Sequence, residues 1–197
     1  SFYNNWHYTY RKFIYTYTLL NQENSVNLYF IGFRGTGKTT LARMVADKLN
    51  KYFYDMDSII EKKENKSIEK IFSLYGEGYF RKLESNLLKE IASMSGLVVS
   101  TGGGIITSEE NRKIIKQTGF VIHLYADKNV IFDRIKRDEN RPPLTNLPLP
   151  EEIEKLLKIR TPFYEEIADF KIDTSEKKLE ECVNLVLSIL DKRGIVL

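Results

Sequence analysis

Residues 26–39 read VNLYFIGFRGTGKT, and this stretch decides the fold. Its first half, over 26–31, is an apolar run with the length and composition of a buried β-strand. Its second half fits the pattern G-x-x-x-x-G-K-S/T, which begins at Gly32 and ends at Thr39. Apolar residues at helical spacing follow over 39–51. A strand, a glycine-rich turn and a helix in this order predict a phosphate-binding loop.

The residue types of this loop indicate its chemistry. Glycines let the backbone wrap around phosphate oxygens with its N–H groups turned inward, and the N-terminus of the following helix adds positive potential. Lys38 is expected to reach the terminal phosphates, and the Thr39 hydroxyl is expected to ligate magnesium. The alternative is an ordinary glycine-rich strand-to-helix turn. The loop predicts a nucleoside triphosphate site, but GTPases, ATPases and small-molecule kinases share it.

Short apolar runs alternate with longer helical stretches in the rest of the chain. Strands are expected at 52–54, 97–100, 120–124 and 170–173, and a helix over 179–190 closes the chain. Such alternation implies right-handed βαβ units and a mostly parallel sheet covered by helices on both faces. Residues 26–197 are therefore predicted to form one α/β domain.

Composition excludes several classes of protein. The 197 residues are 42% hydrophobic and 29% charged, which rules out collagen-like and broadly disordered chains. A net charge of +3, without long blocks of one sign, argues against nucleic-acid binding. No apolar run is long enough to cross a bilayer. Cys182 is the single cysteine, which excludes an intrachain disulfide and favours a reducing compartment, so a cytoplasmic location is expected.

Residues 1–25 differ from the rest of the chain. The first 20 residues contain 8 aromatic side chains and no acidic one, and residues 21–25 have the composition of a linker. Three interpretations stay open: an N-terminal extension, the end of a preceding region of a larger polypeptide, or a cloning remnant. No chemistry is assigned to this segment.

Two carboxylates, Asp55 and Asp57, follow the second expected strand. Side chains two apart on a strand share a face, so both are expected to point into one cleft above the sheet. One would support the metal, and the other would accept a hydrogen bond or the proton from an attacking hydroxyl. The alternative is that Asp57 or Ser58 simply caps the helix that follows.

Three further stretches contain candidate ligand-binding residues. Arg81 lies in an amphipathic stretch, and Arg160 precedes Thr161-Pro162, which is expected to break a helix. Three glycines at 102–104 follow the third expected strand at the carboxyl edge, where open α/β sheets bind ligands. The ordinary interpretations are surface salt bridges for the arginines and a plain turn for the glycines.

Taken in order, the motifs GxxGxGKT, DxD, F-R-x-x-E, GGG, R-P and R-x-P-x-Y-E-E-x-A resemble shikimate kinase across residues 26–190. The resemblance implies transfer of the γ-phosphate of ATP to the 3-hydroxyl of shikimate, with Mg²⁺, on the route to chorismate and the aromatic amino acids. It also implies a nucleoside-monophosphate-kinase-like, three-layer P-loop fold with a five-stranded parallel sheet of order 2-3-1-4-5 and a mobile lid. A monomer without nucleic-acid or membrane partners is expected.

The resemblance also implies roles for individual residues. The lid is expected over 134–147, and the lid arginine Arg141 and the adenine-side Lys177 would contact ATP. The residues matched to ATP phosphates are Gly35, Thr36, Gly37, Lys38, Thr39 and Thr40, those matched to the metal are Thr39 and Asp55, and those matched to shikimate are Asp57, Arg81, Gly102, Gly103, Gly104 and Arg160. Shikimate has a carboxylate and ring hydroxyls, which suit arginine forks at one end and a carboxylate at the other. Asp57, Lys38 and Arg141 are the expected catalytic residues.

Two departures from the family pattern stand out. Arg34 occupies a loop position that is usually apolar in the family, where it would add phosphate affinity or point to solvent. Pro142-Pro143-Leu144 replaces the usual R-P-L-L of the lid. Two other functions stay open: another kinase of this architecture, such as a gluconate or adenylate kinase, and an inactive P-loop paralogue that serves as a binding domain.

Overall fold

The computed structural model describes residues 25–137 and 147–197. Within these ranges the strands form one five-stranded sheet with the order β2-β3-β1-β4-β5, and every neighbouring pair is parallel. The strands are β1 (Asn27–Gly32), β2 (Phe53–Asp55), β3 (Val98–Ser100), β4 (Gly119–Tyr125) and β5 (Phe170–Asp173). The predicted fold class and strand order are confirmed.

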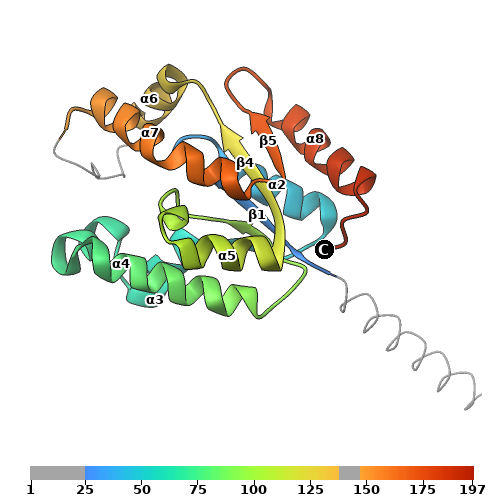
Figure 1. Ribbon diagram of the computed structural model, residues 1–197, viewed down its shortest axis with the longest axis horizontal. Coiled ribbons are helices and arrows are strands. Elements are labelled where there is room, and N and C mark those ends of the chain that lie inside the picture. The colour runs from blue at the N-terminus through green and yellow to red at the C-terminus, as the bar shows by residue number, and fades with distance from the viewer. Residues whose placement is uncertain (1–24, 138–146) are drawn as a thin grey trace, which may run out of the picture.

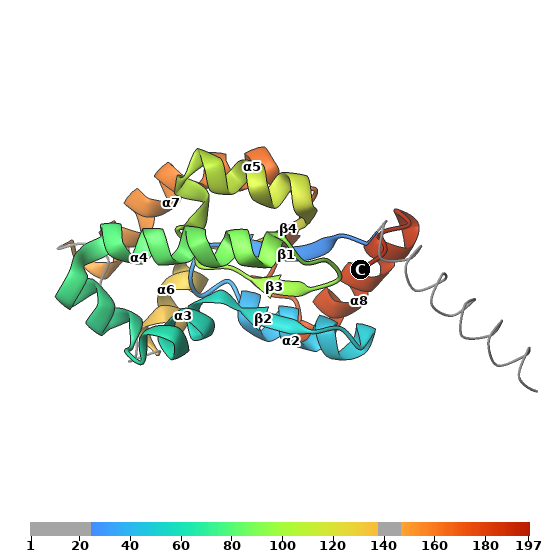
Figure 2. The ribbon, with the colours of Figure 1, turned by 90° about the horizontal axis from the view of Figure 1, so that it is seen from below.

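Helices cover the sheet on both faces (Figures 1 and 2). One face carries α4 (Ile68–Ala92), α5 (Glu109–Thr118) and α7 (Leu149–Ile167), and the other carries α2 (Lys38–Leu49) and α8 (Leu179–Lys192). The remaining helices are α3 (Met56–Glu64), the short η1 (Ile105–Thr107) and α6 (Lys128–Lys136). The three-layer arrangement leaves the carboxyl edge of the sheet open to ligands.

The central strand β1 shows why the sheet is buried from both sides. All six of its residues are buried. Leu28 and Phe30 pack into the cluster with α2 and α8, whereas Tyr29 and Ile31 pack into the cluster with α4, α5 and α7. Alternate side chains thus enter two cores, which explains the continuous apolar run in the sequence.

The second strand is shorter than the strand-face argument for the two aspartates requires. β2 ends at Asp55, and Asp57 lies in the first turn of α3. Met56 and Ile60 are both buried at helical spacing, so the chain turns into a helix directly after Asp55. The prediction that Asp57 shares a strand face with Asp55 is wrong. The helix-cap alternative also misplaces the cap, which is Asp55 and makes no side-chain cap hydrogen bond.

The helix expected to break at Thr161-Pro162 continues through it. α7 runs from Leu149 to Ile167 with Pro162 inside, although an interior proline removes one helical hydrogen bond and costs about 3 kcal/mol. Arg160, Tyr164 and Ile167 are buried on the same side of α7. Their packing against the sheet holds the helix together, as tertiary contacts do for most protein helices.

The range predicted for the lid, residues 134–147, starts inside a helix. Residues 134–136 belong to α6, which ends at Lys136. Arg141 and Pro142-Pro143-Leu144 lie outside the described residues, as do residues 1–24. No helix in the described ranges combines the length and the apolar character needed to cross a membrane.

Candidate active site

The phosphate-binding loop has the backbone shape that its glycines allow. Gly35 and Gly37 adopt φ angles of 79° and 88°, which L-residues with side chains rarely adopt, and Gly37 is the N-cap of α2. The Thr36 hydroxyl and the Lys38 ammonium both donate to the carbonyl oxygen of Phe33, at 2.7 and 2.9 Å. These two hydrogen bonds hold the loop in a tight turn that leads directly into the N-terminus of α2.

Two other segments support this loop. Arg134 of α6 donates to the carbonyl oxygens of Gly35 at 3.2 Å and of Thr174 at 2.6 Å, and the Thr174 hydroxyl donates to the carbonyl oxygen of Thr36 at 3.1 Å. The segment after β5 is thereby held against the phosphate loop. Lys177 lies three residues beyond Thr174 in this segment and is exposed. No pattern in the sequence indicates the supporting role of Arg134, which has ordinary helical spacing.

The two residues matched to magnesium lie on either side of one serine. Asp55 at the end of β2 is paired in register with Ser100 at the end of β3. The hydroxyl oxygens of Ser100 and Thr39 are 3.2 Å apart, and Thr39 and Asp55 line the same cleft. A hydroxyl and a carboxylate are hard oxygen ligands that suit Mg²⁺, which binds few protein groups and keeps positions for phosphates and water. Within the described ranges, no group of three or more His, Cys, Asp or Glu residues forms a metal centre.

A cleft of about 390 Å³ opens beside the phosphate loop at the carboxyl edge of the sheet. It brings together side chains from β2, α2, α3, α4 and α7 with the loop after β3. The predicted site residues that line it are Thr39, Asp55, Asp57, Arg81, Gly102, Gly103, Gly104 and Arg160. Arg34 and Glu84 also line it. The cleft therefore collects every residue matched to the acceptor, from four separate parts of the chain.

Side chains from other segments approach the three glycines closely. A β-carbon at Gly104 would overlap the guanidinium of Arg81. One at Gly102 would overlap the carboxylate of Glu84 and lie 3.0 Å from an oxygen of Asp57. The carbonyl oxygen of Gly103 accepts a hydrogen bond from the Tyr164 hydroxyl at 2.5 Å. The glycine loop thus forms a floor on which the charged side chains rest.

Arg81 is fixed in the cleft by two glutamates of its own helix. Its guanidinium donates to Glu84 at 2.8 Å and to Glu77 at 2.9 and 3.1 Å. These glutamates lie three residues after and four residues before Arg81, which places all three on one side of α4. The resulting fork faces the glycine loop and is oriented before any substrate arrives.

Glu84 is the last residue of the F-R-x-x-E motif, and it lines the same cleft as Arg81. Its side chain is fully buried, and one carboxylate oxygen has no hydrogen-bond partner within the described part of the chain. Burial raises the pKa of Glu84 to about 7, although the neighbouring Arg81 lowers it. The available signal was an acidic residue three positions after Arg81, on the apolar side of the helix.

Arg160 enters the cleft from α7. Its side chain is almost fully buried, and its guanidinium carbon lies 5.9 Å from the centre of the Phe33 ring. One turn later on α7, Tyr164 reaches the glycine loop, and burial raises the pKa of its hydroxyl far above the ordinary value. Tyr164 therefore acts as a neutral hydrogen-bond donor.

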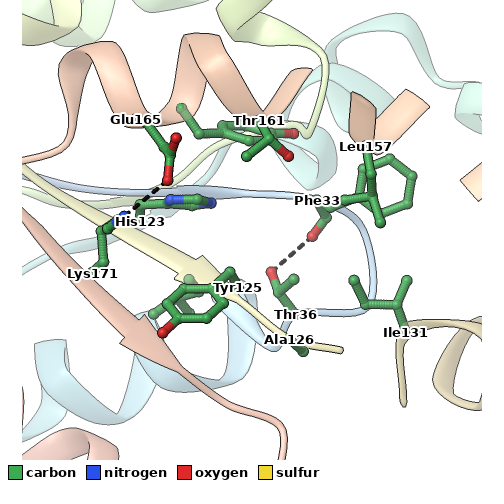
Figure 3. Close-up of a pocket in the computed structure, with 12 residues that line it drawn as sticks. Phe33, Thr36, His123, Tyr125, Ala126, Ile131, Leu157, Thr161, Glu165 and Lys171 are labelled. Atoms are coloured by element: carbon green, nitrogen blue, oxygen red, sulfur yellow. Dashed lines mark hydrogen bonds and ion pairs between the residues drawn. The ribbon is translucent and has the colours of Figure 1, made fainter. Parts of the chain in front are cut away.

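A second, smaller cavity of about 200 Å³ lies between α7 and the ends of β4 and β5 (Figure 3). His123 lines it and stacks on Tyr164 with 4.9 Å between ring centres. Burial lowers the pKa of His123 to about 4, so the imidazole is neutral near pH 7. His123 packs against Tyr164 in this cavity, and it does not line the larger cleft.

Known proteins match this chain over nearly their whole length. The family model described as shikimate kinase matches residues 34–191, a range that includes every predicted site residue. A shikimate kinase from Haemophilus influenzae is 40% identical over 166 residues, which cover 84% of this chain and 92% of that protein. One from Thermodesulfovibrio yellowstonii is 43% identical over 162 residues, covering 82% and 92%. The solved structure of shikimate kinase from Acinetobacter baumannii in complex with shikimate has a TM-score of 0.82 at 37% identity, covering 87% of this chain and 96% of that one.

Proposed function

The chain belongs to the shikimate kinase family, and we propose which of its side chains carry out the family's reaction. It catalyses the ATP-dependent phosphorylation of shikimate, a step of aromatic amino-acid biosynthesis. The gluconate and adenylate kinase alternatives lose their support, because the relatives with 40–43% identity are shikimate kinases. The acceptor oxygen in our proposal is the 3-hydroxyl, and the product is shikimate 3-phosphate with ADP.

The phosphate loop binds the ATP phosphates in this proposal. Its backbone N–H groups and the N-terminus of α2 face the place where phosphates would lie. Lys38 is the first residue of α2, and its ammonium would neutralise the charge that develops on the transferred phosphoryl group. Thr40 and Lys177 are proposed as further ATP contacts, and Arg141 as a further cation over the phosphates.

Mg²⁺ is proposed to bind between Thr39 and Asp55. The pairing of Asp55 with Ser100 and the contact between Ser100 and Thr39 support this assignment. Held by these two side chains, the ion would offset the negative charge of the phosphates. Asp55 and Thr39 fix the place where that charge is needed, at the side of the cleft nearest the loop.

The acceptor end of the cleft binds shikimate in this proposal. Arg81 and Arg160 would hold the carboxylate, because arginine forks match carboxylate geometry in two hydrogen bonds. Asp57 would accept a hydrogen bond from the hydroxyl that attacks. The glycine loop between them brings its backbone close to the side chains of Arg81, Glu84 and Asp57.

The place of Asp57 in the first turn of α3 affects its chemistry. A carboxylate in the first helical turn is stabilised in its charged form by the helix dipole. An ionised Asp57 can accept the proton of the attacking hydroxyl. In a loose phosphoryl-transfer transition state, its main contribution is to orient that hydroxyl toward the phosphorus atom.

One observation carries the proposal: Asp57, Arg81, Arg160 and the glycine loop all line one cleft with Thr39 of the phosphate loop. The test is ADP release in a coupled assay, with and without shikimate, and with gluconate and AMP as competing acceptors. Release that depends on shikimate alone supports the function. Equal release with gluconate or AMP, or none with any acceptor, would contradict it.

We also propose a cytoplasmic location for the protein. A single buried cysteine fits a reducing compartment such as the cytoplasm. A monomer is proposed as the working unit. Residues 26–197 are proposed to be the kinase domain, with residues 1–25 as a separate segment.

A further inference from the structure

The phosphate loop is joined to α7 by a buried ion pair. The guanidinium of Arg34, inside the loop, pairs with the carboxylate of Glu152, in the first turn of α7. The side chains are 8% and 0% exposed. The two residues are 118 positions apart in the chain. The sequence leaves two interpretations of Arg34, as a phosphate contact or as a side chain that points to solvent. In the structure it is buried and paired with Glu152 instead.

A buried ion pair is weak evidence for a role in stability. Removing two charges from water is costly, and well-packed apolar residues often replace such a pair without loss. The apolar residue that the family usually has at position 34 is consistent with this. Some buried pairs instead fix one arrangement among several. The position of this pair shows which arrangement it would fix.

Arg34 and its neighbours contact both halves of the site. Arg34 lines the acceptor cleft together with Asp57 and Arg160. Phe33, the preceding residue, accepts the hydrogen bonds of Thr36 and Lys38 through its carbonyl oxygen. The ring of Phe33 lies under the Arg160 guanidinium at 5.9 Å. A shift of α7 against residues 33–34 would therefore move an acceptor-binding arginine relative to the phosphates.

Helix α7 contacts the phosphate loop and the glycine loop at three positions along its length. Glu152 meets Arg34, Arg160 meets Phe33, and Tyr164 donates to the carbonyl oxygen of Gly103 at 2.5 Å. At 100° per residue, these three positions lie within about 120° on one side of the helix. Glu152 is the contact at the N-terminal end and the one with full opposite charges.

We propose that Arg34 and Glu152 are positioning residues for phosphoryl transfer. Their ion pair holds the start of α7 against the phosphate loop, and thereby keeps Arg160 and the acceptor aligned with the phosphates of ATP. This inference rests on the proposed function, because it assigns Arg160 to the acceptor. Neither residue needs to touch the reacting atoms. Misplacement of an acceptor by about 1 Å is enough to lower a rate by about 100-fold.

The test uses variants on each side of the pair. Arg34→Met and Glu152→Gln are each expected to lower kcat by about 10- to 100-fold and to raise the KM for shikimate. The KM for ATP is expected to stay within about threefold, since the loop backbone is retained. Arg34→Lys keeps the charge and is expected to recover part of kcat. Glu166→Gln is the matched control, because Glu166 lies near the other end of α7 and pairs with Arg112 of α5, with 3.0 Å between nitrogen and oxygen. This variant should leave kcat unchanged.

A double variant separates positioning from stability. Single variants leave one buried charge without its partner and are expected to lower Tm, whereas Arg34→Met/Glu152→Met removes both charges and should regain most of the lost Tm. Positioning predicts that this double variant stays impaired in kcat and in the KM for shikimate. Wild-type kinetics in the double variant would overturn the proposal, as would an equal loss in Glu166→Gln. Failure of the proposed function is a separate result, because the unmodified enzyme would then show no shikimate-dependent ADP release.

Discussion

The phosphate loop and the acceptor cleft occupy the same sheet edge but are built in different ways. The loop takes its main groups from a single stretch, residues 32–40, whose backbone conformation is dictated by its own glycines. The cleft takes its groups from α3, α4, α7 and the glycine loop after β3. A loop of the first kind binds a ligand that many proteins share, whereas specificity for one acceptor depends on side chains that only the complete fold brings together.

The largest expected effect breaks the loop and leaves the cleft intact. Lys38→Ala should lower kcat by about 10³- to 10⁵-fold, the range that a transition-state cation contributes in phosphoryl transfer. The Kd for shikimate, measured by calorimetry, should change little, because Lys38 does not line the acceptor cleft. Retained turnover with an unchanged Kd for ATP would remove Lys38 from the phosphate site.

The next effect concerns the boundary between the two regions. Asp57→Asn keeps the size of the side chain but removes its charge and its capacity to take a proton, so kcat should fall by about 10²- to 10⁴-fold. Binding of ATP and the magnesium requirement should be preserved. A loss of turnover of less than about threefold would be too small for general-base assistance and would contradict the acceptor role.

Asp55→Asn is the matched variant on the metal side. Asp55 is paired in register with Ser100, whose hydroxyl contacts that of Thr39, so its loss should raise the magnesium concentration needed for half-maximal rate. A magnesium titration of both aspartate variants separates the two roles. The assignment fails if Asp57→Asn shifts the magnesium requirement and Asp55→Asn does not.

How far the sequence predicts these two regions follows from how each is built. The strand, loop and helix over residues 26–51 could be predicted from glycine spacing and apolar periodicity, because those properties act locally. The sheet order and the roles of Arg81 and Arg160 came from the resemblance, since no local pattern indicates which distant arginine meets which carboxylate. Predictions from local sequence were wrong at two places where tertiary packing determines the secondary structure. Asp57 joined a helix because Met56 and Ile60 are buried, and α7 continued through Pro162 because its buried face holds it.

Arg81→Ala should have a smaller effect, which is confined to the binding of the acceptor in the cleft. Losing one partner of a buried, hydrogen-bonded charge pair costs about 2–5 kcal/mol. The side chain of Arg81 is 23% exposed, so we expect the lower end, about a 30-fold rise in the Kd for shikimate. The Kd for ATP should stay unchanged. Equal losses for both ligands would mean that Arg81 holds the fold together and does not select the acceptor.

The last effect distinguishes the two regions by pH and concerns Glu84. Its pKa in the folded protein is about 7, raised from 4.5 mainly by burial. A carboxyl whose pKa is raised by folding binds its proton more tightly in the folded state. Its contribution to stability is therefore complete below about pH 4.5 and is lost as the pH rises through about 7.

Glu84→Gln removes this titration while keeping the shape of the side chain. The free energy of unfolding of the wild type, relative to that of Glu84→Gln, should fall by about 2 kcal/mol between about pH 5 and pH 8. Denaturant unfolding at several pH values measures it, and Glu166→Gln, which removes a half-exposed carboxylate, controls for the loss of one charge. A difference that does not vary with pH would show that Glu84 ionises as an ordinary carboxylate. The fork of Arg81 would then be held by a permanent charge, and the cleft would be no more sensitive to pH than the phosphate loop beside it.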